Sequence, residues 1–172
     1  TDGEFDFAKF KKYLKIATRF LDNVNTYSGA PLPEYKASME DKRRIGVGLM
    51  GWGSLLMMLQ IRFGSDEALA LQDQIVKAYS RTVYETSIDL AEEKGMFKHC
   101  DPEKHAESPF IQGLGLSAKY MEKLRTTGIR NSACLSMQPT GNTGIYANVI
   151  SGGIEPVFLP EYIRTASIGE TP

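Results

Sequence analysis

The sequence has few cysteines, few histidines and no long apolar run. Its two cysteines, Cys100 and Cys134, form no C-x-x-C pair and cannot build a disulfide framework, so we expect a cytoplasmic protein. The longest apolar stretch, residues 49–61, is interrupted by glycines and is too short to span a membrane. The first residues also lack the basic region and apolar core of a signal peptide. These absences argue against a disulfide-rich secreted module and against a membrane partner.

No charge of one sign dominates the chain. Lysine and arginine total 20, aspartate and glutamate total 21, and the net charge is −1. A chain without a basic field has no long-range attraction for nucleic acid, so we expect no nucleic-acid partner. The length of 172 residues fits one domain with its own core. Because the chain opens without methionine and stops at Gly-Glu-Thr-Pro, we expect a piece of something longer.

Apolar residues at helical spacing predict most of the secondary structure. The clearest case begins at Ser65, a favourable N-cap followed by two acidic residues, and ends before Gly95, a favourable C-cap. Residues 96–115 carry several prolines and glycines and are expected to be irregular. Helices are predicted over residues 6–24, 33–42, 50–61, 66–94, 117–126 and 143–150.

Few segments have the pattern of strands. Residues 132–137 are apolar and predict a buried strand, residues 45–49 form a shorter apolar run, and residues 157–159 predict the start of a last strand. A free-standing doubly wound sheet needs more strands than these. The expected fold class is therefore α/β: a mostly helical chain with a few short buried strands that belong to a sheet completed elsewhere.

Residues 46–51 read G-V-G-L-M-G and match the G-x-G-x-x-G fingerprint of dinucleotide-binding folds. That fingerprint requires a buried strand directly before the glycines, because the strand aims the turn at the pyrophosphate. Here residues 40–44 are all charged, which is unsuited to a buried strand. We therefore attribute these glycines to close packing between a strand and a helix, and a dinucleotide-binding module stays as an alternative.

The junction from Pro139 to Thr143 lies between the predicted strand and a predicted helix. The first N–H groups of a helix have no intrahelical partner and carry partial positive charge, so they attract anions. A glycine lets a phosphate approach the backbone, and hydroxyl and amide side chains can donate hydrogen bonds to it. The same residue types also cap helices, so these residues alone fit a capped turn as well as a phosphate cradle. The five candidates are Pro139, Thr140, Gly141, Asn142 and Thr143.

Other reactive residues point to structure rather than chemistry. Cys134 lies inside an apolar segment and is interpreted as a structural thiol, and Cys100 is interpreted as a loop cysteine. The basic run at residues 42–44 is expected on a solvated or interdomain surface, with contact to a nucleotide phosphate as the alternative. The two histidines, His99 and His105, lie in the segment expected to be irregular and form no metal signature. We therefore predict no catalytic residue and no metal ligand anywhere in residues 1–172.

Four segments are informative through their order and spacing. They read F-L-D-N-V-N-T-Y, P-L-P-E, R-R-I-G-V-G-L-M-G-W-G-S-L-L and I-R-N-S-A-C-L-S-M-Q-P-T-G-N-T-G-I-Y-A-N-V-I-S-G-G-I-E-P-V-F. Together they resemble the catalytic, or large, subunit of ribonucleotide reductase across nearly the whole chain. The last segment, residues 130–158, is the most specific of the four.

The resemblance implies a partial α/β barrel and a role in nucleotide reduction. The family's barrel has ten strands in two half-barrels, and residues 1–172 are expected to be one partial domain from its C-terminal part. The family makes deoxyribonucleotides for DNA synthesis by radical chemistry, with a cysteine radical and a reducing cysteine pair. Its substrate phosphates lie on the loop that matches Pro139, Thr140, Gly141, Asn142 and Thr143. The resemblance therefore favours the phosphate cradle over the capped turn.

The chain departs from the family pattern at the cysteines. The family's radical cysteine lies in an N-x-C-x-E pattern, which does not occur here. Neither Cys100 nor Cys134 matches the radical or reducing cysteines. The resemblance therefore implies a segment that holds substrate phosphates and has no reductase activity alone. A non-catalytic assembly fragment is the remaining alternative.

The resemblance also implies cofactors and partners for the full enzyme. The P-T-G-N-T loop and G-G-I-E-P-V-F followed by E-Y-I-R-T look closer to the adenosylcobalamin-dependent class, with a diiron radical subunit as the alternative. We expect no cofactor to be bound by this segment alone. The expected partners are a ribonucleotide substrate, the rest of the reductase chain and a thioredoxin-type reductant, and the enzyme is a candidate homodimer.

Overall fold

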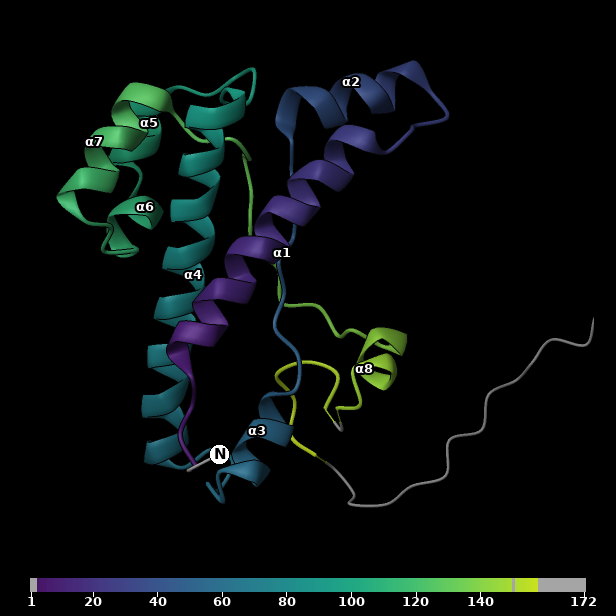
Figure 1. The fold of residues 1–172 in the computed structure, drawn as a ribbon, viewed down its shortest axis with the longest axis vertical. Coiled ribbons are helices and arrows are strands. Elements are labelled where there is room, and N and C mark those ends of the chain that lie inside the picture. The colour runs from purple at the N-terminus through teal and green to yellow at the C-terminus, as the bar shows by residue number, and fades with distance from the viewer. Residues whose placement is uncertain (1–2, 150, 158–172) are drawn as a thin grey trace, which may run out of the picture.

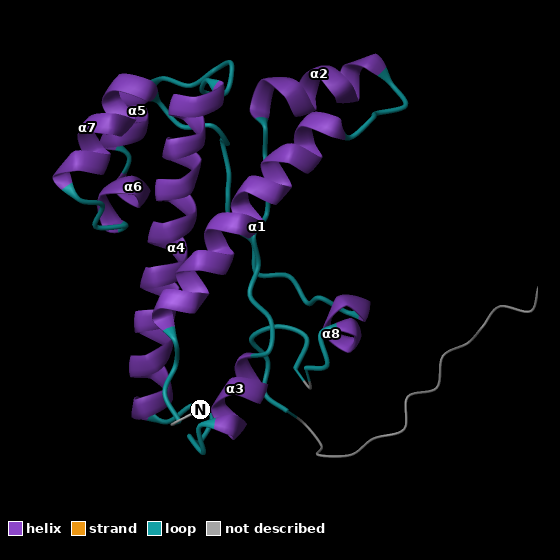
Figure 2. Cartoon of the chain, viewed as in Figure 1, coloured by secondary structure: helices purple, strands orange, loops and turns teal. Residues whose placement is uncertain are grey.

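Two long helices cross at the centre of the molecule, α1 (Phe7–Tyr27) and α4 (Asp66–Lys94) (Figure 1). The computed structural model describes residues 3–149 and 151–157. Within these ranges the chain forms eight helices and no strand, as Figure 2 shows. The other six are α2 (Pro33–Lys42), α3 (Trp52–Met58), α5 (Pro102–Glu107), α6 (Pro109–Gly113), α7 (Ala118–Thr127) and α8 (Asn142–Tyr146).

The ends of the long helices follow from their capping residues. Asp6 accepts a hydrogen bond from the Lys9 N–H at 2.8 Å and starts α1. Ser65 accepts from the Ala68 N–H at 3.2 Å and starts α4, which stops at Gly95 with φ of +84°. The predicted bounds of α4 are confirmed. The first helix is also confirmed and continues three residues beyond the predicted end.

The hydrophobic core lies on both sides of α4. Apolar residues one turn apart on α4, including Tyr79 and Val83, are almost completely buried. Leu14 of α1 packs on one side, while Ile111 and Leu124 of α6 and α7 pack on the other. Burying each such side chain contributes about 1.5–3 kcal/mol. The helix α4 therefore holds α1 and the α5–α7 group in one core, as Figure 1 shows.

The segment expected to be irregular, residues 96–115, contains α5 and α6. Asp101 accepts from the Lys104 N–H and Ser108 accepts from the Ile111 N–H, so each short helix has an N-cap. Each helix has proline at its first turn, where the missing N–H costs nothing. The prediction was wrong because these prolines start helices rather than break them. The α7 prediction is confirmed, with Ser117 as its N-cap.

The predicted strands do not form within the described ranges. Residues 45–49 and 132–137 run side by side, but they share one isolated parallel bridge, between Val47 and Leu135. Two neighbouring segments without further strands make a marginal sheet, and parallel pairs need support from both faces. The ten-stranded barrel is thus not formed by the described residues. The predicted strand at 157–159 lies mostly outside the described residues.

The two helices near the candidate loop are shorter than predicted. The helix α3 covers seven residues, and its last residues Met57 and Met58 are 50% and 78% exposed. It is therefore not the buried helix that the apolar run of residues 50–61 predicted. The helix α8 covers five residues, Asn142–Tyr146, so it starts one residue before the predicted range 143–150 and shares four residues with it.

Candidate functional site

Two glycines of the 46–51 segment allow it to lie close to the segment that precedes the candidate loop. The Ile45 N–H donates to the Ala133 carbonyl at 2.9 Å. A Cβ added to Gly46 would lie 2.8 Å from the Ser136 hydroxyl, which is closer than real Cβ contacts. A Cβ added to Gly48 would lie 3.1 Å from the Gln138 amide. Gly46 and Gly48 therefore allow a close approach to the extended segment 133–138, whereas the sequence interpretation expected packing between a strand and a helix.

The same geometry argues against the dinucleotide-binding alternative. The helix α2 ends at Lys42, and residues 43–45, which lie directly before the motif, form no strand that could aim a turn at a pyrophosphate. The third glycine, Gly51, has φ of +78°, and a Cβ there would lie 3.2 Å from Val149. The space that a dinucleotide would need beside these glycines is occupied by protein atoms.

The candidate loop is held in place by Thr140. Its N–H donates to the Gly152 carbonyl at 3.0 Å, and its hydroxyl donates to the same carbonyl at 2.5 Å. The Thr140 carbonyl accepts from the Thr143 N–H at 3.0 Å, which begins the turn into α8. Thr140 is half-buried, so in this structure its donors position the loop and do not face solvent.

The next residues are the accessible part of the loop. Gly141, Asn142 and Thr143 are exposed, and Gly141 has φ of +52° with open space around its Cα. Within residues 3–149 and 151–157, no acceptor is bonded to the N–H groups of Gly141 and Asn142. Two consecutive donors and two polar side chains are thus presented to solvent, which is an arrangement that suits an anion.

The segment 151–155 closes the site from the other side. The Ser151 hydroxyl accepts from the Gly53 N–H at 3.0 Å, which holds the segment against the start of α3. The Glu155 carboxylate accepts from the Gly153 N–H at 3.0 Å and stays beside the loop. Glu155 was not among the site residues predicted from the sequence. The signal that could have identified it is its position in the G-G-I-E-P run, close behind the candidate loop.

A cavity of about 210 Å³ lies between the loop and this segment. Of the five predicted residues, Pro139 lines it, together with Leu49, Met137, Gln138, Gly153, Ile154 and Glu155. No lysine or arginine is part of this lining, and the Glu155 carboxylate would repel a phosphate there. The described residues therefore offer backbone and side-chain donors for an anion, without the cations that would neutralise it.

A buried ion-pair network joins the segments on which the family resemblance rests. Asp22 of α1 is completely buried and pairs with Arg43 at 2.7 Å, Arg130 at 3.2 Å and Lys94 at 3.3 Å. Asn131 donates to the same carboxylate at 3.1 Å. Removing Asp22 would leave its three cations without their shared counter-ion, and removing Arg43 would take away the shortest of the three pairs. The network fixes the first helix against the chain that leads into the candidate loop.

The position of Arg43 corrects an expectation. The basic run 42–44 was expected on a surface, yet the Arg43 side chain is 8% exposed, while Lys42 and Arg44 are exposed. The signal for this burial was Asp22, which follows Leu14 and Thr18 at intervals of four on the buried face of α1. A carboxylate on that face requires a cationic partner.

Burial by itself would raise the pKa of Asp22, because it disfavours the charged carboxylate. The hydrogen bond and charge of Arg43, the charge of Arg130 and the hydrogen bond from Asn131 outweigh burial, so the pKa lies below its usual value. Asp22 is therefore ionised at neutral pH and serves the structure. It is not poised for proton transfer.

Neither cysteine is activated as a nucleophile. Burial raises the pKa of the Cys134 thiol to about 12, and burial also raises the pKa of Cys100. The groups that act on the pKa of the two thiols, beside burial, are Ile129 and Asp101 at Cys100, and Ser87, Asp22 and Tyr84 at Cys134, and none of these groups is a cation. Both cysteines are structural here, which agrees with the interpretation of the sequence.

Metal-binding and membrane-spanning features are absent from the described residues. No group of three or more histidine, cysteine or carboxylate side chains is placed to hold a metal ion within residues 3–149 and 151–157. Over the same ranges, no helix combines the length and the apolar character needed to cross a membrane.

A comparison with protein families matches the whole chain. The family model described as "Ribonucleotide reductase, barrel domain" matches residues 1–172. This match covers the candidate loop, the glycine segment and the buried ion-pair network together.

Several curated proteins are similar to the chain over most of its length. The ribonucleoside-diphosphate reductase large chain of Encephalitozoon cuniculi is 31% identical, over 98% of this chain and 23% of that protein. The vitamin B12-dependent ribonucleoside-diphosphate reductase of Mycobacterium tuberculosis strain CDC 1551 / Oshkosh is 30% identical, over 95% of this chain and 21% of that protein. The enzyme of the same name from Thermoplasma acidophilum is 30% identical, over 98% of this chain and 20% of that protein. The chain spans about a fifth of the length of these relatives.

Proposed function

Since this chain belongs to the ribonucleotide reductase barrel-domain family, we propose that it is part of an enzyme that reduces ribonucleotides to deoxyribonucleotides for DNA synthesis. The observation that carries the proposal is the match of the family model to all 172 residues. The relatives are named as reductases of ribonucleoside diphosphates, which supports a diphosphate as the substrate. Residues 1–172 would act as one partial domain of that enzyme.

The proposed substrate-binding residues are Pro139, Thr140, Gly141, Asn142 and Thr143. Two exposed, consecutive N–H groups and the absence of a side chain at Gly141 support phosphate binding at this loop. Thr140 would position the loop through its bonds to Gly152, while Asn142 and Thr143 would contact the phosphate oxygens. Cations for the phosphate charge would come from other parts of the enzyme, since none line the adjacent cavity.

The chain would bind substrate without performing the reduction. It lacks the N-x-C-x-E pattern of the family's radical cysteine, and its own thiols are structural, with a pKa of about 12 at Cys134. The radical and the reducing electrons would therefore come from other parts of the enzyme and from a thioredoxin-type reductant.

Adenosylcobalamin is the proposed cofactor of the full enzyme, because two of the relatives described above are named as vitamin B12-dependent. The described residues do not fit this group. The cavities beside the loop and α3 hold about 210 and 270 Å³. Pockets for drug-sized ligands hold about 300–1,000 Å³, and a corrin is larger than such ligands. No step of the reaction is assigned to this chain through the cofactor.

A stripe of exposed apolar residues on α1 supports a role beside other parts of a longer enzyme. Residues three or four positions apart share one face of a helix, and here five of them face solvent. Their exposed fractions are Tyr13 57%, Ile16 54%, Phe20 63%, Val24 41% and Tyr27 86%. An apolar face of this kind marks an interaction surface. We propose that it packs against the remainder of the barrel domain, which also fits the share of the relatives that the chain spans.

The proposed site can be tested by titrating the isotope-labelled chain with cytidine diphosphate and following backbone amides by NMR. We expect the amide signals of Gly141 and Asn142 to shift, because their N–H groups have no acceptor among the described residues and lie at the proposed phosphate position. The Gly141→Val variant should abolish these shifts, since a branched side chain would occupy the approach to the backbone.

Gly64→Val is the matched control. Gly64 is exposed, has φ of +77° and has open space around it, so the substitution strains a left-handed backbone there as it does at Gly141, where φ is +52°. The control should bind cytidine diphosphate like the parent chain. Unmoved loop amides, or equal loss of binding in both variants, would contradict the site assignment.

A further inference from the structure

Tyr79 of α4 connects the hydrophobic core to the chain that leads into the candidate loop. Its side chain is 1% exposed, and its hydroxyl donates to the Val47 carbonyl at 2.5 Å. The same hydroxyl lies 3.4 Å from the carbonyl of Ser136, which comes three positions before Pro139. One buried side chain of α4 therefore contacts both extended segments of the candidate site.

The Val47 carbonyl is the point where these two segments meet. It accepts a second hydrogen bond from the Ser136 N–H at 2.9 Å, and the single parallel bridge joins Val47 to Leu135. Two short segments without further strands hold each other weakly. No other strand flanks them among residues 3–149 and 151–157, so the Tyr79 hydroxyl supplies part of the support that a neighbouring strand would give.

The loop is held by one contact before it and by another within it. The first is Ser136, which is fixed through Tyr79, and the second is the pair of hydrogen bonds from Thr140 to the Gly152 carbonyl. The free N–H groups of Gly141 and Asn142 come directly after this second contact. Losing the first contact would leave Thr140 to set the position of these donors.

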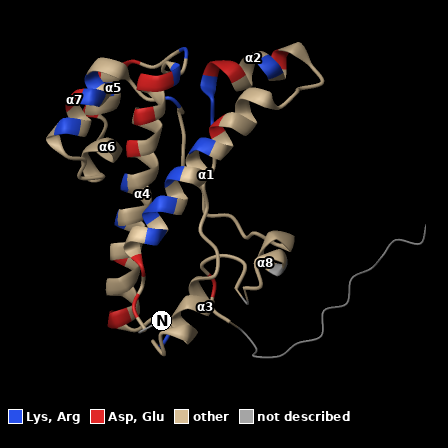
Figure 3. Ribbon diagram, viewed as in Figure 1, with Lys and Arg blue, Asp and Glu red and all other residues tan. Residues whose placement is uncertain are grey.

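The loop residues carry no charge with which they could form ion pairs. Residues 45–61 and 131–154 contain no aspartate, glutamate, lysine or arginine. Figure 3 shows charged residues on α1, α2, α4, α5 and α7, and none on α3 or α8. Neutral hydrogen bonds therefore hold this part of the chain, and a buried one is costly to leave unmade.

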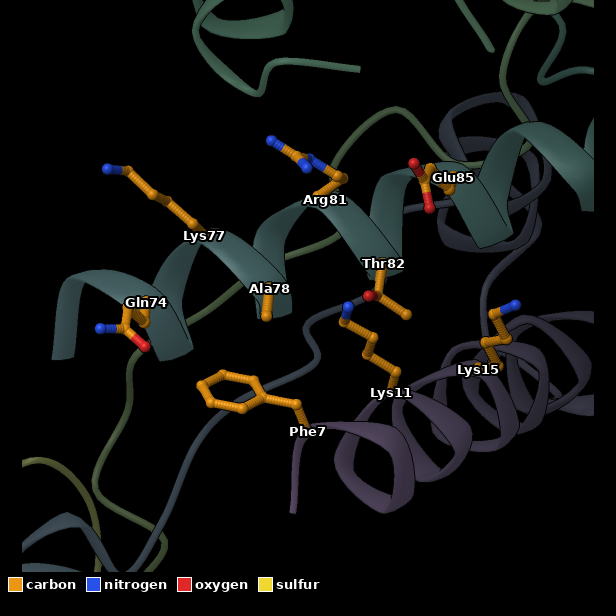
Figure 4. Close-up of a pocket in the computed structure, with 9 residues that line it drawn as sticks. All are labelled: Phe7, Lys11, Lys15, Gln74, Lys77, Ala78, Arg81, Thr82 and Glu85. Atoms are coloured by element: carbon orange, nitrogen blue, oxygen red, sulfur yellow. The ribbon is translucent and has the colours of Figure 1, made fainter. Parts of the chain in front are cut away.

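The basic residues of α1 and α4 do not converge on a second anion site. Lys11 and Lys15 line the α1 side of a groove between these helices. Figure 4 shows that Lys77 and Arg81 of α4 point away from these two lysines. The Arg81 Nε donates instead to the Leu114 carbonyl at 3.2 Å. We therefore expect a phosphate ligand at the loop rather than between the two helices.

We propose that Tyr79 is a positioning residue for the substrate phosphate. Its hydroxyl holds the segment before the loop, so that the Gly141 and Asn142 N–H groups keep the orientation that an anion needs. A loop that is ordered in advance loses less conformational freedom on binding, so its affinity for the ligand is higher. This inference rests on the proposed function of the loop.

The test compares Tyr79→Phe with the parent chain by NMR titration with cytidine diphosphate. The change removes the hydroxyl and keeps the ring that fills the core. We expect the dissociation constant, measured at the Gly141 and Asn142 amides, to rise about threefold to tenfold, because the loop must then be ordered on binding. Without ligand, the Ser136 amide should exchange with solvent faster in the variant. A loss of global stability alone would not change the dissociation constant at a temperature where both chains are fully folded.

Tyr120→Phe is the matched control. The Tyr120 hydroxyl donates to the Asp89 carboxylate at 3.1 Å, and neither residue lines the cavity beside the loop. This variant loses a hydroxyl hydrogen bond elsewhere in the fold, so its dissociation constant should stay within about twofold of that of the parent.

The outcomes separate this inference from the proposed function. A parent chain that binds cytidine diphosphate no more tightly than Tyr79→Phe overturns the role of Tyr79 and leaves the phosphate site standing. Equal weakening in Tyr79→Phe and Tyr120→Phe also overturns it, since the effect would then not be specific to the loop. A parent chain that does not bind the nucleotide contradicts the phosphate site itself, and the positioning role with it.

Discussion

Arg43 and Asp22 form a buried ion pair, with Nη2 of the guanidinium 2.7 Å from Oδ1 of the carboxylate. Arg43 ends α2 with φ of +46°, in the left-handed region that large residues avoid. This conformation turns the chain so that the guanidinium reaches back to α1. The strain of the backbone is offset by the hydrogen bonds that Arg43 donates to Asp22 and Thr26.

Replacing Arg43 should destabilise the fold strongly. Arg43→Ala leaves the buried Asp22 carboxylate without its closest partner, and we expect a loss of about 3–5 kcal/mol in the free energy of unfolding. Urea denaturation followed by circular dichroism measures this. Arg44→Ala is the control, because Arg44 is an exposed neighbour of the same type, and it should change stability by less than about 0.5 kcal/mol. Equal losses in both variants would show that the pair is not buried in solution.

The pH dependence of stability should report on Asp22. Its pKa is lowered in the folded state, so its contribution is present above the pKa of the unfolded chain and is lost as the pH falls through the lower folded value. Stability should therefore decrease as the medium is acidified below about pH 4. In Asp22→Asn this contribution is absent, so the variant should be less stable than the parent at pH 7 and its stability should fall less on acidification. Unfolding curves recorded between pH 2 and pH 7 make the comparison, and parallel profiles would count against the ionised, buried carboxylate.

A methyl group at Gly53 should weaken the contact between α3 and the segment 151–155. The added Cβ would lie 3.0 Å from the Glu155 carbonyl oxygen, a backbone atom that cannot rotate away. We expect Gly53→Ala to lower the free energy of unfolding by about 1–3 kcal/mol, which is the usual cost of overpacking.

Gly113→Ala provides the opposite case. Gly113 is also helical, but nothing lies within 4 Å of its added Cβ, so the gain in helix propensity should stabilise the chain by about 0.5–1 kcal/mol. Calorimetric melting curves of the two variants should shift in opposite directions. A shared direction would mean that the close contact at Gly53 is not present.

Thiol labelling should distinguish the two cysteines. Cys134 is completely buried and has a pKa of about 12, so it should resist alkylation at pH 7.5 until the chain unfolds. Cys100 is half-buried with a raised pKa and should react slowly but measurably. Mass spectrometry of the native and the urea-unfolded chain, with Cys100→Ser to assign the signals, gives the result. Rapid native labelling of Cys134 would contradict its structural role.

Local signals predicted the helices well where a cap and a periodic apolar face agreed. Ser65 and Gly95 bound the longest helix because capping depends on residues within one turn of each end. The same local reasoning was wrong for residues 96–115, since a proline favours the first turn of a helix and disfavours its interior. The strand prediction for 132–137 was wrong because a strand needs neighbours, and the described residues supply a single bridge.

The sequence by itself determined the family and the main helices, because these depend on ordered motifs and on local chemistry. Only the tertiary structure decided that Arg43 is buried against Asp22, since the two are 21 positions apart and meet through a turn that no local pattern indicates.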